Sequence, residues 1–178
     1  MSSATVTLND GTVIPTLAFG SGTAVALSMQ DASVQLEEAI NAGFRHLDTA
    51  QMYRNEHSVG KAIAESGVPR SELFITTKLD KLPEGKTVKD TLRDSLRDLR
   101  LDYVDLFLLH MPVDHPDLKQ TWKEIEECKE EGLAKSIGVS NCQPKHFEVI
   151  LSEAKVIPSI NQVCRTIVNL EPHLIRTS

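Results

Sequence analysis

Cysteine is scarce in this sequence, and the few cysteines present form no recognisable framework. Cys128, Cys142 and Cys164 are odd in number and show no CxxC spacing. Neither a disulfide-stapled domain nor a structural zinc site is indicated, and isolated thiols of this kind are typical of a reducing compartment. We therefore expect a cytoplasmic protein with buried or incidental thiols and no metal site.

Positive charge and long apolar runs are lacking as well. The formal net charge is -6, which argues against a non-specific nucleic-acid surface, because such surfaces need clustered Lys and Arg. No stretch approaches the ~18 consecutive apolar residues of a membrane span, and the first ten residues lack the basic-then-apolar order of a secretory signal. The chain also carries no linker or low-complexity segment. We expect one domain, with neither nucleic acid nor membrane as a partner.

What the sequence does contain is a repeated placement of reactive residues directly after short apolar runs. Five such runs end at Asp48, Lys78, His110, Asn141 and Gln162. Helical patterns follow the first four of them, at about 56–66, 88–99, 118–131 and 144–154. Alternation of strand and helix predicts a parallel sheet with crossover helices, and reactive groups at the strand ends are typical of a (β/α)8 barrel.

Two further segments complete the expected fold. The turn signal Asn9-Asp10-Gly11 lies between the β-prone runs Thr5–Leu8 and Thr12–Ile14, which predicts an amino-terminal β-hairpin. Leu17–Gly20 adds a first strand, so six strands follow the hairpin, whereas a complete barrel of eight units usually takes about 250 residues. The expected fold class is α/β: an incomplete TIM barrel of about six of eight strand-helix units, plus the hairpin.

Each reactive residue taken alone has an ordinary structural interpretation. Asp48 is then a capping or loop carboxylate, Lys78 a solvated charge and Tyr53 a half-buried aromatic, while His110 is a histidine before a turn. The loop 20–23, with the sequence GSGT, lacks the spacing of a phosphate-binding motif. The functional interpretation depends on these residues occurring together and in this order.

The segment GFRHLDTA at 43–50, followed by Tyr53, Glu56 and Gly60, strongly resembles the aldo-keto reductases. The resemblance continues through Lys78, the run DLFLLH ending at His110, KSIGVSN at 135–141 and INQV at 160–163. It covers about residues 7–163 and leaves 164–178 as a divergent tail. Residues 1–178 are thus identified as a single, carboxy-terminally truncated barrel domain of this family.

The resemblance implies a barrel that binds NADPH and reduces small aldehydes or ketones to alcohols by hydride transfer. The family's catalytic residues correspond to Asp48, Tyr53, Lys78 and His110. Its cofactor-binding positions also include Asp48. The turn after the first strand corresponds to Gly22 and Thr23, and the polar residues that face the nicotinamide correspond to Ser140, Asn141 and Gln162.

The residue types suit that chemistry. Hydride addition to a carbonyl leaves an alkoxide that needs a proton, and a phenol with an ordinary pKa of about 10 is a reluctant donor at neutral pH. An ammonium at Lys78 stabilises the phenolate that Tyr53 leaves behind, and Asp48 holds that ammonium charged and in place. His110 can donate to the carbonyl oxygen, and amides suit the carboxamide of nicotinamide. No metal is needed.

The sequence departs from the family after Val163, where the last two strand-helix units and the loop that holds the adenosine 2'-phosphate are missing. The preference for NADPH over NADH and the identity of the carbonyl substrate are therefore left open. Six strands also leave two open sheet edges, which predicts low stability and self-association. Two alternatives remain: a catalytically silent truncated paralogue or isoform with a binding or regulatory role, and, more weakly, a reductase-like partner of potassium channels.

Overall fold

The computed structural model describes residues 4–22 and 31–163, and its architecture follows the strand-helix alternation of the chain. An antiparallel hairpin comes first, formed by β1 (Thr5–Thr7) and β2 (Val13–Pro15). Gly11 occupies its turn with φ +86°, a conformation that favours glycine. The hairpin predicted from Asn9-Asp10-Gly11 is confirmed.

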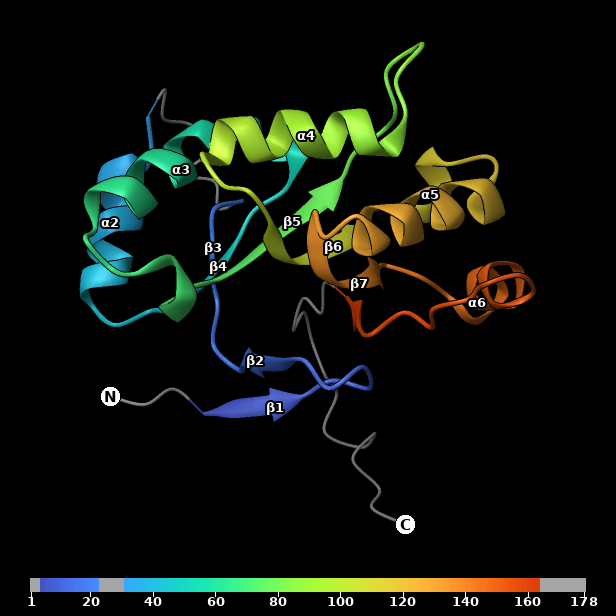
Figure 1. The fold of residues 1–178 in the computed structure, drawn as a ribbon, viewed down its shortest axis with the longest axis horizontal. Helices are drawn as coiled ribbons and strands as arrows, with labels where there is room; N and C mark the ends of the chain where they lie inside the picture. The colour runs from blue at the N-terminus through green and yellow to red at the C-terminus, as the bar shows by residue number, and fades with distance from the viewer. Residues whose placement is uncertain (1–3, 23–30, 164–178) are drawn as a thin grey trace, which may run out of the picture.

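Six strands form the second sheet, which is parallel throughout and curls into part of a barrel (Figure 1). Their spatial order is their chain order, because each strand pairs with the one before it along the sequence. The incomplete-barrel prediction is therefore confirmed for the described residues. The strands are β3 (Phe19–Gly20), β4 (His46–Asp48), β5 (Phe74–Leu79), β6 (Val104–Leu109), β7 (Ala134–Ser140) and β8 (Asn161–Gln162).

Crossover helices connect the strands and cover the outer face of the curled sheet (Figure 1). In α4 the start follows directly from the sequence, because Thr87 and Asp90 form a reciprocal capping box. The predicted helical ranges agree with the observed bounds to within three residues. The helices are α2 (Ser33–Asn41), α3 (Glu56–Glu65), α4 (Val88–Leu99), α5 (Leu118–Glu130) and α6 (Pro144–Leu151), with short 3-10 turns η1 (Gln51–Tyr53), η2 (Arg70–Glu72) and η3 (Pro112–Asp114).

The larger of two apolar clusters lies between the sheet and the helices, and the smaller lies on the inner face of the sheet beside the hairpin. The inner cluster contains Ile14 from β2 with Phe74, Leu106 and Leu108 from the sheet. The hairpin is also tied to the sheet by polar contacts: Ser136 Oγ donates to Asp10 Oδ2 at 2.8 Å, and Lys129 Nζ lies 3.0 Å from the same oxygen. The hairpin thus closes the amino-terminal end of the curled sheet.

Helices α3 and α4 approach each other at Gly60. A Cβ atom on Gly60 would lie 2.5 Å from the carbonyl oxygen of Asp98 and 2.6 Å from the carbonyl carbon of Leu99. Real Cβ atoms do not come so close to backbone, so only glycine permits this approach. The contact positions α3 against α4, and hence the segments that lead into and out of β5.

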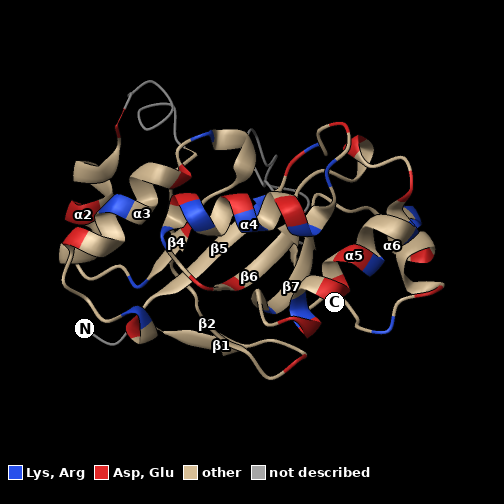
Figure 2. Cartoon of the chain, turned by 45° about the horizontal axis from the view of Figure 1, so that its top comes forward, with Lys and Arg blue, Asp and Glu red and all other residues tan. Residues whose placement is uncertain are grey.

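Surface composition and cysteine placement agree with the expectations from the sequence. Figure 2 shows charges of both signs interspersed along α2 to α5, while the strands of the sheet are mostly uncharged. Cys128 and Cys142 are buried free thiols, and burial raises their pKa to about 12 and about 11; Cys164 lies outside the described residues. In the part of the chain that the structure describes, no helix is long and apolar enough to cross a membrane.

Candidate active site

The carboxyl ends of the parallel strands bring the predicted reactive residues together at one edge of the sheet. Asp48 ends β4, Lys78 is the fifth residue of β5, and His110 follows β6 directly. Tyr53 reaches the same place from η1, the turn after β4. They line a cavity of about 290 Å³, whose full lining is Asp48, Tyr53, Lys78, His110, Ser140, Asn141, Gln162 and Val163.

A buried ion pair forms the floor of this cavity. Lys78 Nζ lies 2.5 Å from Asp48 Oδ1 and donates a second hydrogen bond to the carbonyl oxygen of Thr49 at 3.0 Å. The Lys78 side chain is only 2% exposed. Burial lowers the pKa of Lys78, and the Asp48 carboxylate opposes that shift. The pair therefore keeps a cation in a place where water does not reach it.

Tyr53 lies between this cation and the histidine. Lys78 Nζ is 5.3 Å from the centroid of the Tyr53 ring, and the His110 ring meets the Tyr53 ring edge-on at a centroid distance of 5.8 Å. Gly22 also packs against this ring, because a Cβ atom there would come within 2.6 Å of it. The first-strand turn thus packs directly against the phenol, which explains why a residue without a side chain occupies position 22.

His110 contributes a neutral ring to the cavity. Burial lowers its pKa and the Lys78 cation lowers it further, so the ring is uncharged at neutral pH. Its Nδ1 is buried and has no hydrogen-bond partner among residues 4–22 and 31–163. A neutral imidazole still carries one N–H donor, and it can therefore orient a carbonyl oxygen without adding charge.

Polar groups from β7 and β8 form the remaining wall. The Ser140 hydroxyl donates to the Gln162 carbonyl oxygen at 2.7 Å, and the Asn141 N–H donates to the same oxygen at 3.0 Å. Gln162 Nε2 donates to Asp48 Oδ2 at 2.9 Å, so both carboxylate oxygens of Asp48 are engaged. Asn141 adopts φ +55°, a left-handed conformation that asparagine tolerates better than most residues. The two amides and the hydroxyl therefore face one space.

A second polar network lies behind the ion pair, and it was not predicted from the sequence. Asn55 Nδ2 donates to the Ser21 carbonyl oxygen at 2.9 Å, and the Ser21 hydroxyl donates to Thr49 Oγ1 at 2.9 Å. Ser21 N–H in turn donates to the carbonyl oxygen of Asp48 at 2.8 Å. The network fixes the loop after β3 against the end of β4. Its sequence signal was weak: Asn55 precedes a predicted helix, where asparagine is a common cap.

Of the predicted site residues, the structure brings seven to one place. Asp48, Tyr53, Lys78, His110, Ser140, Asn141 and Gln162 line the cavity, and Gly22 packs against Tyr53. Thr23 lies outside the described residues. Their roles in binding and catalysis stay predictions. Among the described residues, no cluster of three or more His, Cys, Asp or Glu side chains is arranged to hold a metal ion.

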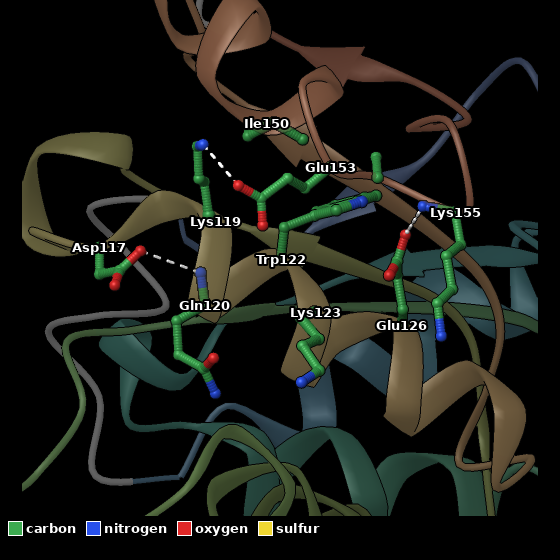
Figure 3. A pocket seen from close by; sticks show the side chains of 10 residues that line it. Asp117, Lys119, Gln120, Trp122, Lys123, Glu126, Ile150, Glu153 and Lys155 are labelled. Carbon is green, nitrogen blue, oxygen red and sulfur yellow. Dashed lines mark hydrogen bonds and ion pairs between the residues drawn. The ribbon is translucent and has the colours of Figure 1, made fainter.

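A larger hollow of about 480 Å³ lies elsewhere, between α5 and α6 (Figure 3). Its acidic groups are already engaged: Glu153 pairs with Lys119 at 2.6 Å, and Glu126 accepts the backbone N–H groups of Lys155 and Val156 at 2.7 Å each. Trp122, on its floor, donates from its ring nitrogen to the Val156 carbonyl oxygen. These contacts join two helices and engage the carboxylates of Glu126 and Glu153.

Comparison with known proteins agrees with this geometry. The family model described as "Aldo/keto reductase family" matches residues 16–177. The methylglyoxal reductase DkgA of Escherichia coli K12 is 43% identical over 159 residues, covering 89% of this chain and 56% of that protein. Human aldo-keto reductase family 1 member C1 is 41% identical, with 89% and 57% covered. The chain thus spans little more than half the length of these curated relatives.

Solved structures give the same result. The fold matches an aldo/keto reductase from Brucella melitensis with a TM-score of 0.82 and 42% identity, covering 91% of this chain and 63% of that one. It also matches Bombyx mori aldo-keto reductase AKR2E4 in complex with NADP, with a TM-score of 0.78, 38% identity and 92% and 58% covered. The strand-end cavity, the sequence matches and the shared fold agree: this chain belongs to the aldo/keto reductase family.

Proposed function

We propose that this chain reduces small aldehydes or ketones to alcohols with NADPH, with Tyr53 as the proton donor. The observation that carries the proposal is the buried Lys78 ammonium, held by Asp48 on one side and placed 5.3 Å from the Tyr53 ring on the other. A cation beside a phenol favours the phenolate that proton donation leaves. Substrate and proton donor then meet in a cavity that is closed below by the ion pair.

The remaining residues have roles that follow from their surroundings. Asp48 holds Lys78 charged despite burial, and this keeps the phenolate-stabilising charge in place. Neutral His110, edge-on to Tyr53, orients the carbonyl oxygen toward the phenol proton. Proton donation by Tyr53 neutralises the developing alkoxide beside the buried Lys78 side chain, where electrostatic stabilisation is stronger than in bulk water.

The chemistry of the polar wall fits the nicotinamide end of a cofactor. Asn141 and Gln162 provide carboxamide groups and Ser140 a hydroxyl, and such groups complement a ligand carboxamide by paired hydrogen bonding. Bound NADPH supplies the hydride. By the family resemblance, Gly22 and Thr23 are proposed to contribute to the cofactor site, and Gly22 lies at its edge because it packs directly against the Tyr53 ring. The Bombyx mori relative was solved with NADP.

The test is aldehyde-dependent oxidation of NADPH by the purified chain, run beside Tyr53→Phe. We expect turnover with methylglyoxal, which the name of the Escherichia coli relative suggests, and with a reactive aromatic aldehyde. Tyr53→Phe removes the phenol hydroxyl and keeps the ring. It should lower kcat about 10²-fold, which is the lower end of the effect expected when a general acid is lost. Tyr103→Phe, which alters the other tyrosine of the chain, is the matched control and should leave kcat unchanged.

Binding measurements separate the proposal from a catalytically silent protein. NADPH fluorescence titration with turnover supports the reductase, whereas NADPH binding without turnover from a folded sample supports a binding or regulatory role. Turnover that survives Tyr53→Phe would overturn the assignment of the proton donor.

We also propose that the 178-residue chain self-associates through its sheet edges. In the described residues the sheet ends at β3 and β8, and the apolar residues Ile157 and Val163 beside β8 are 64% and 53% exposed. Exposed strand edges are templates for pairing with another chain. Light scattering after size-exclusion chromatography should show concentration-dependent oligomers that Ile157→Lys weakens and Val113→Lys, at a still more exposed apolar residue outside β8, does not. A monodisperse monomer at all concentrations would contradict this.

A further inference from the structure

The 3-10 turn that carries Tyr53 is anchored by the amide side chain of Gln51. Gln51 Oε1 accepts the backbone N–H of Asp80 at 2.9 Å, and Gln51 Nε2 donates to Ser95 Oγ at 3.1 Å. Asp80 follows β5, and Ser95 is buried on α4. One side chain on η1 is therefore hydrogen-bonded both to the end of β5 and to the helix that follows it.

A second contact with β5 is made by Glu56, the first residue of α3. The neighbouring Ser95 hydroxyl acts to lower the pKa of the Glu56 carboxylate. Thr77 Oγ1 donates to Glu56 Oε1 at 2.6 Å. Burial raises the pKa of Glu56, and the bond from Thr77 and the neighbouring Ser95 act against that shift. Direct hydrogen bonds thus reach β5 at Thr77 from Glu56 and at Asp80 from Gln51, on both sides of Lys78.

The backbone of η1 gives Tyr53 little support of its own. It is a single 3-10 turn between an extended Ala50, with φ -160°, and a left-handed Arg54, with φ +53°. Its internal bonds are Tyr53 N–H to the Ala50 carbonyl at 3.0 Å and Arg54 N–H to the Gln51 carbonyl at 3.1 Å. Isolated 3-10 turns have poor hydrogen-bond geometry and are easily distorted. The Gln51 side chain adds direct hydrogen bonds from this turn to the end of β5 and to α4.

We propose that Gln51 is a positioning residue that sets Tyr53 at its distance from Lys78. The inference rests on the proposed function, because it deepens the role of the Tyr53–Lys78 pair. Gln51 binds η1 directly to the residue after β5, Asp80, and to Ser95 on α4, which neighbours the Glu56 carboxylate that Thr77 of β5 bonds. The distance between the Tyr53 phenol and the Lys78 ammonium is consequently held constant. Loss of the anchor lets η1 drift outward and weakens the effect of the cation on the phenol.

The chain has only two tyrosines, Tyr53 and Tyr103, and this permits a direct measurement. In a Tyr103→Phe background the ultraviolet absorbance of tyrosinate reports the ionisation of Tyr53 alone. Gln51→Leu in that background should raise the midpoint of the titration by about one pH unit, toward the ordinary value of about 10. Gln120→Leu is the matched control, since it removes an exposed amide that bonds only Glu124 on α5; its midpoint should not move.

Ser95→Ala provides a second variant that leaves the Gln51–Asp80 bond intact. It should shift the midpoint in the same direction by a smaller amount, and it decides the question if Gln51→Leu does not fold. An unchanged tyrosine midpoint in folded Gln51→Leu would overturn the proposal. If Gln51→Leu does not fold, an unchanged midpoint in Ser95→Ala would overturn it instead. A purely structural role predicts a lower melting temperature without a shift of the midpoint.

Kinetics give an independent readout. In Gln51→Leu we expect kcat to fall about 10-fold while KM for NADPH and for the aldehyde stays within twofold, since misplacement of a reacting group by a fraction of an ångström acts on the chemical step. A loss of kcat/KM that comes entirely from a higher KM, with kcat unchanged, would overturn the proposal. A shifted tyrosine midpoint in a chain without any turnover would instead uphold the positioning role and refute the proposed reductase activity.

Discussion

Replacing Lys78 with methionine should reduce carbonyl turnover by at least ~10³-fold and destabilise the fold at the same time. The catalytic loss follows from removing the buried cation beside Tyr53, while methionine keeps the length and apolar stem of lysine. The stability loss follows because Asp48 is left as a buried carboxylate without its partner, which costs about 3 kcal/mol in the free energy of unfolding. NADPH oxidation and urea unfolding of the same preparations measure both effects.

A second substitution separates the two effects. Asp48→Asn in the Lys78→Met background removes the uncompensated charge, and its side-chain oxygen can still accept from Gln162 Nε2. We expect stability to recover by most of the lost amount and turnover to remain absent. Lys61→Met, which breaks an exposed ion pair with Asp31 at 2.9 Å, is the control and should change neither quantity by much. Recovery of turnover in the double variant would contradict the role assigned to Lys78.

Gly60→Ala should destabilise the chain by about 2–3 kcal/mol, a large loss for the addition of one methyl group. The new Cβ would fall 2.5 Å from the Asp98 carbonyl oxygen, and because backbone cannot rotate away as a side chain does, α3 and α4 must separate. Their separation opens the apolar cluster between helices and sheet. Thermal or urea unfolding followed by circular dichroism measures the change.

Gly20→Ala serves as the comparison for this effect, since a Cβ at Gly20 would have no neighbouring atom within 4 Å. It should leave stability nearly unchanged. Equal stability of the Gly60→Ala and Gly20→Ala variants would mean that α3 and α4 are not held at the observed distance.

The strand ends were predictable because their signal is local. An apolar run followed by Asp48, Lys78 or His110 identifies both the strand and the polar residue at its end, and parallel topology then gathers those residues at one edge. The range 88–99 of α4 was predicted equally well, because its helical periodicity is also a local signal. The family resemblance added the role proposed for each residue.

The supporting contacts were not predictable, because they depend on distances between elements that the sequence does not encode locally. Gln51 lies 44 residues from Ser95, and Asn55 lies 34 residues from Ser21. An amide on a loop has no periodicity that indicates its partner. The left-handed conformation of Asn141 was predictable only in part. Asparagine tolerates this conformation, but the hydrogen bond of the Asn141 backbone N–H to the Gln162 carbonyl, which explains it, is seen only in the structure.

The order of the strands also has a consequence for how the molecule assembles. Each strand of the sheet pairs with its predecessor in the chain, so the sheet can grow one unit at a time as residues emerge from the ribosome. The hairpin is the exception, because Asn9 bonds the Pro158 carbonyl 149 residues later and Asp10 bonds Ser136 126 residues later. Contacts that span such separations form late. The hairpin, which precedes the six strands in the chain, can thus dock only after β7 and the segment before β8 have been made.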